Sequence, residues 1–226
     1  MRFIFVRHGE SVGNVEGRFQ GLADEPLTEL GLEQARRVAA TLAGSGPVAA
    51  VYASPLRRAA DTAAEIGRAL GVTPEVEPDL RELDCGVATG LTWVEFSGRY
   101  PEAAARAMAS RDGQDVDDLW PGGEKVSAFR SRCWAAVDRI AARHPTGTVV
   151  VVAHGGSIGW ALAHLLDPEE DAWPTHHLPN ASIAEVLIEG GRAAAVRIGD
   201  VRHLTRDAGA PSPFTRPLGR GIISQA

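Results

Sequence analysis

Two histidines stand directly after apolar runs of strand length. His8 follows Phe3–Val6 in FIFVRHGES, and His154 follows the β-branched run Thr148–Ala153 in TVVVVAHGGS. An imidazole can attack phosphorus when a hydrogen-bond acceptor orients its other ring nitrogen. Arg7 precedes His8, and a planar guanidinium matches the oxygens of a phosphoryl group. The two stretches therefore predict one anion site that contains a nucleophile.

Small and polar residues next to the two histidines favour the same interpretation. Gly9 permits a ligand to approach the backbone closely. Gly155 and Gly156 precede a predicted helix, whose first amides would be free to bind an anion. Asn14 and Arg18 follow on the loop after Gly9 and can add further donors.

Three more charged residues are candidates for the same site. Arg57 and Arg58 begin a predicted helix in SPLRRAADTA, where cations oppose the helix macrodipole unless an anion binds there. Glu82, in DLRELDCGVATG, follows a predicted β-type segment. Among several cations it is a candidate proton donor to a leaving alkoxide. Taken one at a time, these side chains are equally typical of solvated surface charge.

The order of the predicted elements indicates an α/β fold. Apolar runs of strand length alternate with stretches that repeat apolar residues at helical spacing. This alternation predicts a three-layer α/β/α sandwich with a mostly parallel central sheet, in which ligands bind beyond the carboxyl ends of the strands. The predicted strands are 3–6, 48–52, 148–153, 182–188 and 193–198. One predicted helix follows Thr28, a second starts at Ser54-Pro55 and is stopped by Gly71, and two more span 126–142 and 157–166.

A single domain is expected over residues 1–204. Residues 93–123 are less regular and contain an acidic stretch, and we interpret them as an insertion that packs over the site as a partial lid. Residues 205–226 are rich in Gly, Pro, Ser and Arg, which indicates a flexible C-terminal tail or a subunit-contact arm.

Composition narrows the class of protein. The chain has 226 residues, 44% of them hydrophobic, and a net charge of −6, without the basic excess typical of nucleic-acid binding. No apolar run approaches the roughly 20 residues that span a membrane, and the N-terminal run is too short for a signal peptide. The two cysteines, Cys85 and Cys133, suggest buried thiols rather than a disulfide framework. We therefore expect a cytoplasmic protein with no nucleic-acid or membrane partner.

Five motifs occur in a fixed order: RHGES with Asn14, SPLRRAADTA, LRELDCGVATGLT, PGGE and VVAHGG. In this combination the chain resembles the histidine phosphatase superfamily, also called phosphoglycerate-mutase-like, over roughly residues 1–204. Two positions depart from the family pattern. Ala88-Thr89-Gly90 stands where the family often has Trp-Glu-Gly, and Lys125 replaces the usual serine after PGGE.

The resemblance implies a role for each matching residue. His8 would be the nucleophile that becomes phosphohistidine, held by an adjacent acceptor. Arg7, Arg58 and a protonated His154 would hold the phosphoryl oxygens. Glu82 would protonate the leaving group and then activate the hydrolytic water. Auxiliary donors and residues lining the substrate route would be Asn14, Gly155, Arg18, Gln20 and Gly21.

The expected function is hydrolysis of a small phosphate ester without a metal or another cofactor. The sequence has no HExxH or carboxylate-rich metal motif, and the adjacent His176 and His177 would face apart on a regular element. The acidic insertion lacks paired arginines, which favours the phosphatase branch over a mutase. Mutase-type phosphotransfer and an inactive phospho-ligand binding module are the alternatives.

A homodimer is compatible with the resemblance. Three insertion aromatics would either pack in the core or contact the non-phosphate part of the substrate: Trp93, Phe96 and Trp120.

Overall fold

The computed structural model describes residues 1–109, 117–167 and 176–207. Its centre is a six-stranded sheet in the order β3-β2-β4-β1-β5-β6. The first four of these strands pair in parallel, whereas β5 runs antiparallel to both β1 and β6. The sheet is therefore mostly parallel, as predicted, with an antiparallel hairpin at one edge. The strands are β1 (Arg2–Arg7), β2 (Ala50–Ala53), β3 (Glu75–Val76), β4 (Thr148–Ala153), β5 (Ile183–Glu189) and β6 (Arg192–Asp200).

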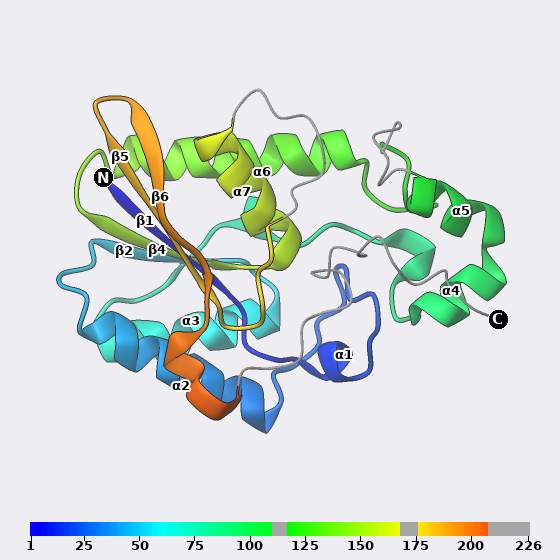
Figure 1. Cartoon of the computed structure of the whole chain (residues 1–226), viewed down its shortest axis with the longest axis horizontal. Coiled ribbons are helices and arrows are strands. Elements are labelled where there is room, and N and C mark those ends of the chain that lie inside the picture. Colours follow the sequence, from blue (N-terminus) through cyan, green and yellow to red (C-terminus); the bar gives the residue numbers. More distant parts are fainter. Residues whose placement is uncertain (110–116, 168–175, 208–226) are drawn as a thin grey trace, which may run out of the picture.

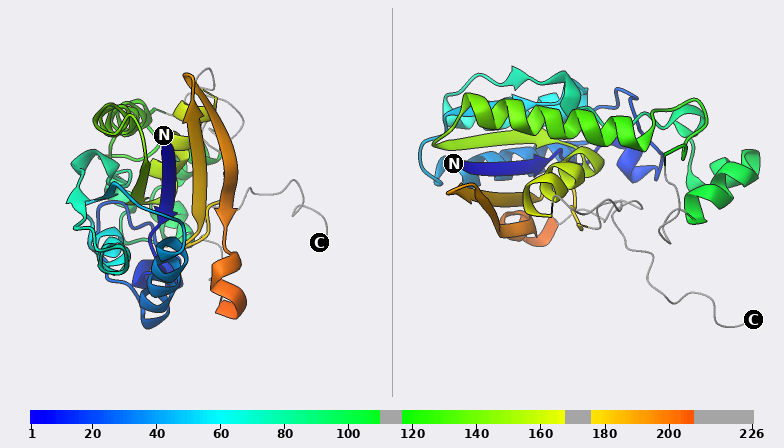
Figure 2. Two further views of the ribbon diagram at one scale, coloured as in Figure 1. Left: turned by 90° about the vertical axis from the view of Figure 1, so that its left-hand side faces the viewer. Right: turned by 90° about the horizontal axis from the view of Figure 1, so that it is seen from above.

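Helices cover both faces of the sheet, which confirms the three-layer sandwich (Figures 1 and 2). Helices α2 (Glu29–Ala43) and α3 (Arg57–Leu70) pack on one face, and α6 (Val126–Arg143) and α7 (Gly155–Leu166) pack on the other. The strands supply both cores because successive side chains point to opposite faces. Every residue of β4 from Val149 onward is fully buried, as the continuous apolar run predicts.

The register of β1 and β4 places the two histidines side by side. Arg7, the last residue of β1, lies opposite Ala153, the last residue of β4. The backbone amide of His8 donates a 3.0 Å hydrogen bond to the carbonyl of Ala153, so His8 and His154 leave the sheet from adjacent positions. Both lie at carboxyl ends of parallel strands, where α/β sheets bind ligands.

The predicted helix boundaries at Thr28 and Gly71 are confirmed, whereas the predicted starts of α3 and α7 are wrong. Helix α7 begins at Gly155, before its predicted start at 157, because the glycine pair already has helical geometry. The Thr28 side chain accepts a hydrogen bond from Gly31 at the start of α2, and Gly71 ends α3 in the left-handed conformation. Helix α3, however, begins at Arg57, with Leu56 at the N-cap position. Ser54 does not cap it, because its hydroxyl accepts from the amide of Leu56 and lies against His154.

Helix α6 begins without the hydroxyl that the family pattern usually supplies. Lys125 occupies the N-cap position and provides no side-chain cap. Instead, the carboxylate of Asp117 accepts a 2.8 Å hydrogen bond from the amide of Ser127, and its backbone carbonyl accepts from Val126. The Lys125 ammonium lies 3.5 Å from the same carboxylate. An acidic residue of the insertion thus replaces the missing cap.

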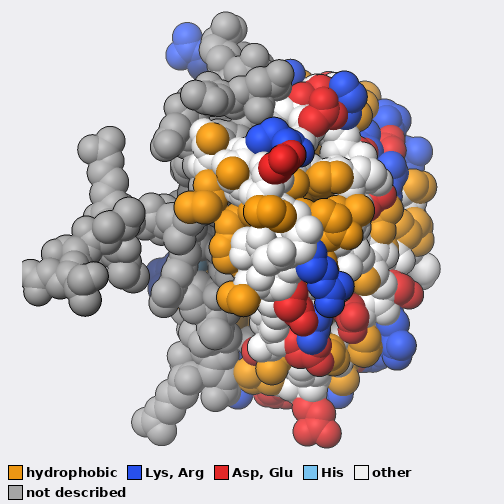
Figure 3. Space-filling model, turned by 90° about the vertical axis from the view of Figure 1, so that its right-hand side faces the viewer, with side chains coloured by type: hydrophobic (Ala, Val, Ile, Leu, Met, Phe, Trp, Pro, Cys, Tyr) orange, Lys and Arg blue, Asp and Glu red, His pale blue; other side chains and the backbone are white. Residues whose placement is uncertain are grey.

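The insertion is more regular than predicted. It contains α4 (Trp93–Arg99) and α5 (Pro101–Ala109), which lie beyond the carboxyl end of β1, on the side of the molecule that carries α1 (Val12–Val15) (Figure 1). Figure 3 shows this face, on which hydrophobic side chains are interspersed with charged ones. Much of the acidic stretch lies outside the described residues.

The aromatic residues of the insertion divide between the two predicted roles. Phe96 is fully buried, and Trp120 lies 4.8 Å from the ring of Phe19, between ring centroids. Trp93 is 38% exposed, so part of its ring remains accessible.

At the C-terminal end of the described chain, the 3₁₀ helix η4 (Arg202–Asp207) runs past the predicted domain end at 204. Residues 208–226 lie outside the described part.

Candidate active site

His8 is buried directly after β1, and one hydrogen bond fixes the tautomer of its ring. Its Nδ1 lies 2.7 Å from the carbonyl oxygen of Gly9, which can only accept, so Nδ1 carries the hydrogen. Nε2 then holds a lone pair in the neutral ring. Burial lowers the pKa of His8 well below 6.5, and the charges of Arg58 and Arg7 lower it further. The ring is therefore neutral at physiological pH, as an attacking imidazole must be.

Two buried arginines lie beside this ring. Arg7 donates from Nη1 to the carbonyl of Leu178 over 2.7 Å, and Arg58 donates to the carbonyls of Ala23 and Gly21 over 2.7 and 2.9 Å. Burial is the largest influence on both; it lowers the pKa of Arg7 to about 10 and also lowers that of Arg58. Within the described ranges, the Nε atoms of both side chains are buried and have no hydrogen-bond partner.

His154 completes the cluster from the end of β4. Its ring lies 5.1 Å from that of His8, between ring centroids, and its Nε2 is 2.7 Å from the hydroxyl of Ser54. Its Nδ1 is buried without a partner among the described residues. Burial, followed by Arg58, His8 and Arg7, lowers the pKa of His154 well below 6.5. The expected protonated form is therefore disfavoured here, and it would require the negative charge of a bound anion.

Glu82 is held at the start of α7. One carboxylate oxygen accepts from the amide of Gly156 over 3.1 Å, and the other accepts from the amide of Leu83 over 3.0 Å. Its charge acts on Arg7 and Arg58, which places it in the same cluster. Two expectations need correction. Glu82 follows the 3₁₀ turn η1 (Pro78–Leu80) rather than a strand, and the Gly156 amide is occupied by Glu82.

Gly9 has a role different from the expected one. A Cβ at this position would collide with the carbonyl of Gly31, in the first turn of α2. The glycine therefore lets the loop pack against a helix. Its amide donates to the hydroxyl of Thr62 over 3.1 Å, and that hydroxyl donates to the carbonyl of Arg58 over 2.8 Å. Thr62 thus connects the loop of His8 to the helix that carries Arg58.

Asn14 and Gln20 lie in a polar network beside the nucleophile loop. The hydroxyl of Ser11 is 2.7 Å from Oδ1 of Asn14 and 2.8 Å from Oε1 of Gln20. Asn180 donates from Nδ2 to Oδ1 of Asn14 over 3.0 Å. The same Nδ2 lies 3.2 and 3.3 Å from the carbonyls of His8 and Gly9. This network fixes the backbone whose carbonyl orients the imidazole.

The other predicted substrate-lining residues occupy different surroundings. Gly155 passes over Arg7, since a Cβ there would lie 3.8 Å from the guanidinium. Gly21 contributes the carbonyl that binds Arg58. The guanidinium of Arg18 contacts Glu16 over 2.6 Å, Glu95 over 3.2 Å and the carbonyl of Gly90 over 2.7 Å. Arg18 thus joins its loop to α4, and these contacts are outside the cluster around His8.

Three residues of the site were not assigned a role from the sequence: Ser54, Thr62 and Asn180. Ser54 and Thr62 flank Arg58 in the second motif, and Asn180 lies just before β5. Each is buried, with 1% exposure or less. Buried polar residues beside a motif arginine or histidine are a usable signal, because each must find a hydrogen-bond partner.

The described ranges contain no group of three or more His, Cys, Asp or Glu side chains suited to hold a metal ion. His176 and His177 lie within these ranges. In the same part of the chain, no helix is both long and apolar enough to cross a membrane.

Two histidines just after β1 and β4, Arg7 at the end of β1 and Arg58 in the first turn of α3 form a cationic cluster whose donors suit a phosphoryl group. The chain belongs to the histidine phosphatase superfamily (branch 1), whose sequence profile matches residues 3–201. It is 33% identical over 203 residues to a metal-independent phosphoserine phosphatase of Arabidopsis thaliana, covering 89% of this chain and 82% of that protein.

Two further relatives show the reach of the similarity. The chain is 36% identical over 199 residues to a bifunctional protein of Mycobacterium tuberculosis, covering 87% of this chain but only 53% of that protein. The structure of a mycobacterial glucosyl-3-phosphoglycerate phosphatase in complex with VO3 superimposes with a TM-score of 0.75 at 34% identity, covering 86% of this chain and 96% of that chain. The named relatives thus include phosphatases with different substrates.

Proposed function

We propose that this chain is a metal-independent phosphomonoesterase that hydrolyses a small phosphorylated metabolite through a phosphohistidine at His8. The observation that carries the proposal is a set of buried nitrogen atoms without partners in the described structure. They are Nε of Arg7, Nε of Arg58 and Nδ1 of His154, and they belong to side chains that share one electrostatic cluster with His8. Buried donors are normally satisfied, so an anionic ligand is the natural partner of the two arginine Nε–H groups, and of His154 Nδ1 when that nitrogen carries a hydrogen.

The first half of the reaction would form a phosphorus–nitrogen bond. Nε2 of His8 attacks the phosphorus atom while the bond to the ester oxygen breaks. Arg7 and Arg58 stabilise the charge on the equatorial oxygens, which is the main demand of phosphoryl transfer. Glu82, in its protonated form, gives its proton to the leaving alkoxide.

The second half would regenerate the enzyme. The Glu82 carboxylate takes a proton from a water molecule as that water attacks the phosphorus atom of phosphohistidine. The phosphorus–nitrogen bond then breaks, leaving neutral His8 and inorganic phosphate. The Nδ1–H bond to the Gly9 carbonyl keeps the ring in the required tautomer during both halves.

The phosphate half of the substrate is specified by the cluster, and the other half by the loops around it. Trp93 is 38% exposed on the insertion, and its ring lies 6.2 Å from that of Phe19, between ring centroids. Relatives are named for phosphoserine and for glucosyl-3-phosphoglycerate. A small phosphorylated hydroxyl compound is therefore the proposed substrate class.

The test is trapping of the intermediate. Wild-type enzyme is mixed with ³²P-labelled aryl phosphate in the presence of chelator and quenched within milliseconds. Acid-labile, alkali-stable label on the protein, and its absence from His8→Ala, are the expected results. Label that persists in His8→Ala would remove this residue from its role.

The two alternatives give different outcomes in a metabolite panel. Interconversion of phosphoglycerates with negligible phosphate release would identify a mutase. Absence of both turnover and label between pH 5 and 8, with phosphate still bound, would identify a binding module.

A further inference from the structure

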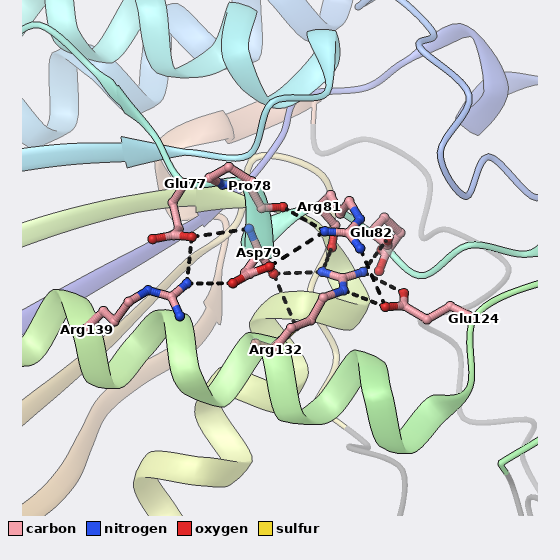
Figure 4. Close-up of polar contacts among 9 residues, drawn as sticks. Glu77, Pro78, Asp79, Arg81, Glu82, Glu124, Arg132 and Arg139 are labelled. Atoms are coloured by element: carbon pink, nitrogen blue, oxygen red, sulfur yellow. Dashed lines mark hydrogen bonds and ion pairs between the residues drawn. The ribbon is translucent and has the colours of Figure 1, made fainter.

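Arg132, in the middle of α6, is bound by the loop that carries Glu82 (Figure 4). A guanidinium has five N–H donors, and Arg132 makes five hydrogen bonds of 2.7 to 2.9 Å. Nη1 donates to the carbonyls of Asp79 and Arg81, and Nη2 donates to the carbonyl of Glu82. The remaining two bonds go to the carboxylate of Glu124.

We propose that Arg132, neutralised by Glu124, is a positioning residue that fixes Glu82 for its proton transfers. This inference rests on the proposed function of the site. Arg132 would not touch the substrate. It would act through the backbone of Glu82, because the carbonyl of Glu82 and two nearby carbonyls of the same loop all accept from one guanidinium.

Two independent contacts hold Glu82 between helices α6 and α7. Arg132 binds its backbone carbonyl, and the amide of Gly156 binds its carboxylate. The ring of Phe129 lies between these contacts. The Arg132 guanidinium carbon is 4.7 Å from the ring centroid, and a Cβ on Gly156 would lie 3.1 Å from the same ring. The two helices and the acid thus form one packed unit.

Glu124 is fixed in turn by the segment that precedes α6. Its amide donates to the carbonyl of Asp84 over 3.0 Å. A Cβ on Gly123 would collide with that carbonyl, and a Cβ on Gly86 would collide with the carbonyl of Pro121. Gly123 of PGGE and Gly86 of the facing loop therefore allow two backbones to meet, and this places Glu124 next to the loop of Glu82. The pair is well shielded, with 10% of the Arg132 and 15% of the Glu124 side chain exposed.

Arg139 provides a matched control. It lies about two turns later on α6 and contacts the same loop, through Glu77 over 2.8 Å and Asp79 over 2.7 Å. Its side chain is 49% exposed, and its hydrogen bonds within the described structure are to the side chains of Glu77 and Asp79, with none to the backbone of Glu82. A lysine at 139 keeps the charge next to both carboxylates. A lysine at position 132 keeps the charge but has a single ammonium group, which cannot make the five hydrogen bonds of the guanidinium.

The experiment compares Arg132→Lys and Arg139→Lys with an aryl and an alkyl phosphate. A poor leaving group needs the proton of Glu82, so we expect kcat for the alkyl ester to fall about tenfold more in Arg132→Lys than kcat for the aryl ester. Water activation also needs Glu82. The aryl ester should therefore show a burst of leaving group and accumulate phosphohistidine in Arg132→Lys. Arg139→Lys should resemble the wild type.

Competitive inhibition by inorganic phosphate reports whether the anion site is intact. An unchanged inhibition constant in Arg132→Lys, combined with the leaving-group effect and the burst, supports the positioning role. Equal losses for both esters without a burst would overturn it. If Arg132→Lys does not fold, Glu124→Gln replaces it, since one amide cannot accept both guanidinium bonds, and the same pattern is expected. A wild type that traps no label would count against the proposed function instead.

Discussion

The amide of Gly156 donates a hydrogen bond to the carboxylate of Glu82 over 3.1 Å, although 74 residues separate the two in the chain. Gly156 lies in the first turn of α7, whose N-cap residue is His154. One helix start therefore orients both the proposed acid and one of the proposed phosphate ligands.

Substitution of Gly156 by alanine should damage proton transfer more than phosphate binding. The new Cβ would lie 2.5 Å from Oε1 of Glu82 and 3.1 Å from the ring of Phe129, so the carboxylate must move. We expect a loss of about 10²-fold in kcat for alkyl phosphates, with inhibition by inorganic phosphate nearly unchanged. Gly44→Ala is the control, because its Cβ would meet only the carbonyl of Thr41 at 3.7 Å. Equal activity of the two variants would contradict the contact.

Phosphate should stabilise the protein through Arg58 and not through its neighbour Arg57. Arg58 is 1% exposed with an unpartnered Nε in the described structure, whereas the Arg57 side chain is 59% exposed and lies 3.5 Å from Asp61. Phosphate at about 100 times its Kd should raise the free energy of unfolding by about 2.7 kcal/mol. Thermal unfolding should show this gain in Arg57→Met and lose most of it in Arg58→Met. The same gain in both variants would place the anion elsewhere.

Acidification should destabilise the unliganded protein below pH 6.5. Burial is the largest cause that lowers the pKa values of His8 and His154 in the folded state, whereas unfolded histidine titrates near 6.5. Below that pH the unfolded chain binds protons that the folded chain does not, so stability falls as pH falls. Each histidine contributes up to about 1.4 kcal/mol per pH unit, and above pH 6.5 neither contributes.

Urea unfolding between pH 7.5 and 5 measures this slope. His154→Gln should show a clearly smaller dependence than the wild type in this window, because one buried imidazole is lost, while His8 and His203, whose pKa burial also lowers, contribute in both proteins. An unchanged slope in the variant would show that His154 is not held neutral.

Asn180→Asp should weaken the nucleophile loop although it keeps the size of the side chain. Nδ2 of Asn180 faces three oxygen atoms, from His8, Gly9 and Asn14. A carboxylate has no donor to offer them and brings a negative charge beside the anion site. We expect a loss of about 2 kcal/mol in the free energy of unfolding and weaker inhibition by phosphate. A variant as stable as the wild type would show that Asn180 is not needed to hold the loop.

Local patterns in the sequence predicted the layers of the fold. The β-branched run from Thr148 to Ala153 coincides with β4, and Thr28 and Gly71 bound their helices as expected. These features depend on residues a few positions apart. The predicted start of α3 was wrong, although serine is a residue type that often caps helices. The Ser54 hydroxyl instead contacts His154, which is 100 residues away in the sequence.

The sequence also predicted which residues would cluster, but not what holds them. Arg7, His8, Arg58, Glu82 and His154 share one cluster, as their positions after strands and their motif match suggested. The hydrogen bonds of Arg132 to the loop of Glu82 were not predicted, because they go to backbone carbonyls, which every residue type has. The packing of Gly9 against the carbonyl of Gly31 was not predicted either, because the two residues are more than 20 positions apart in the sequence. Gly9 was predicted only to let a ligand approach.

The insertion and the contacts that hold Glu82 belong to different segments of the chain. The insertion spans residues 93–123, yet the hydrogen bonds that hold Glu82 come from Arg132 on α6 and Gly156 on α7. The insertion can therefore change in length and composition without moving the acid. A protein built in this way can acquire a new substrate by exchanging one surface segment while its reaction chemistry is inherited intact, and grafting the insertion of a relative onto this chain is the corresponding engineering route.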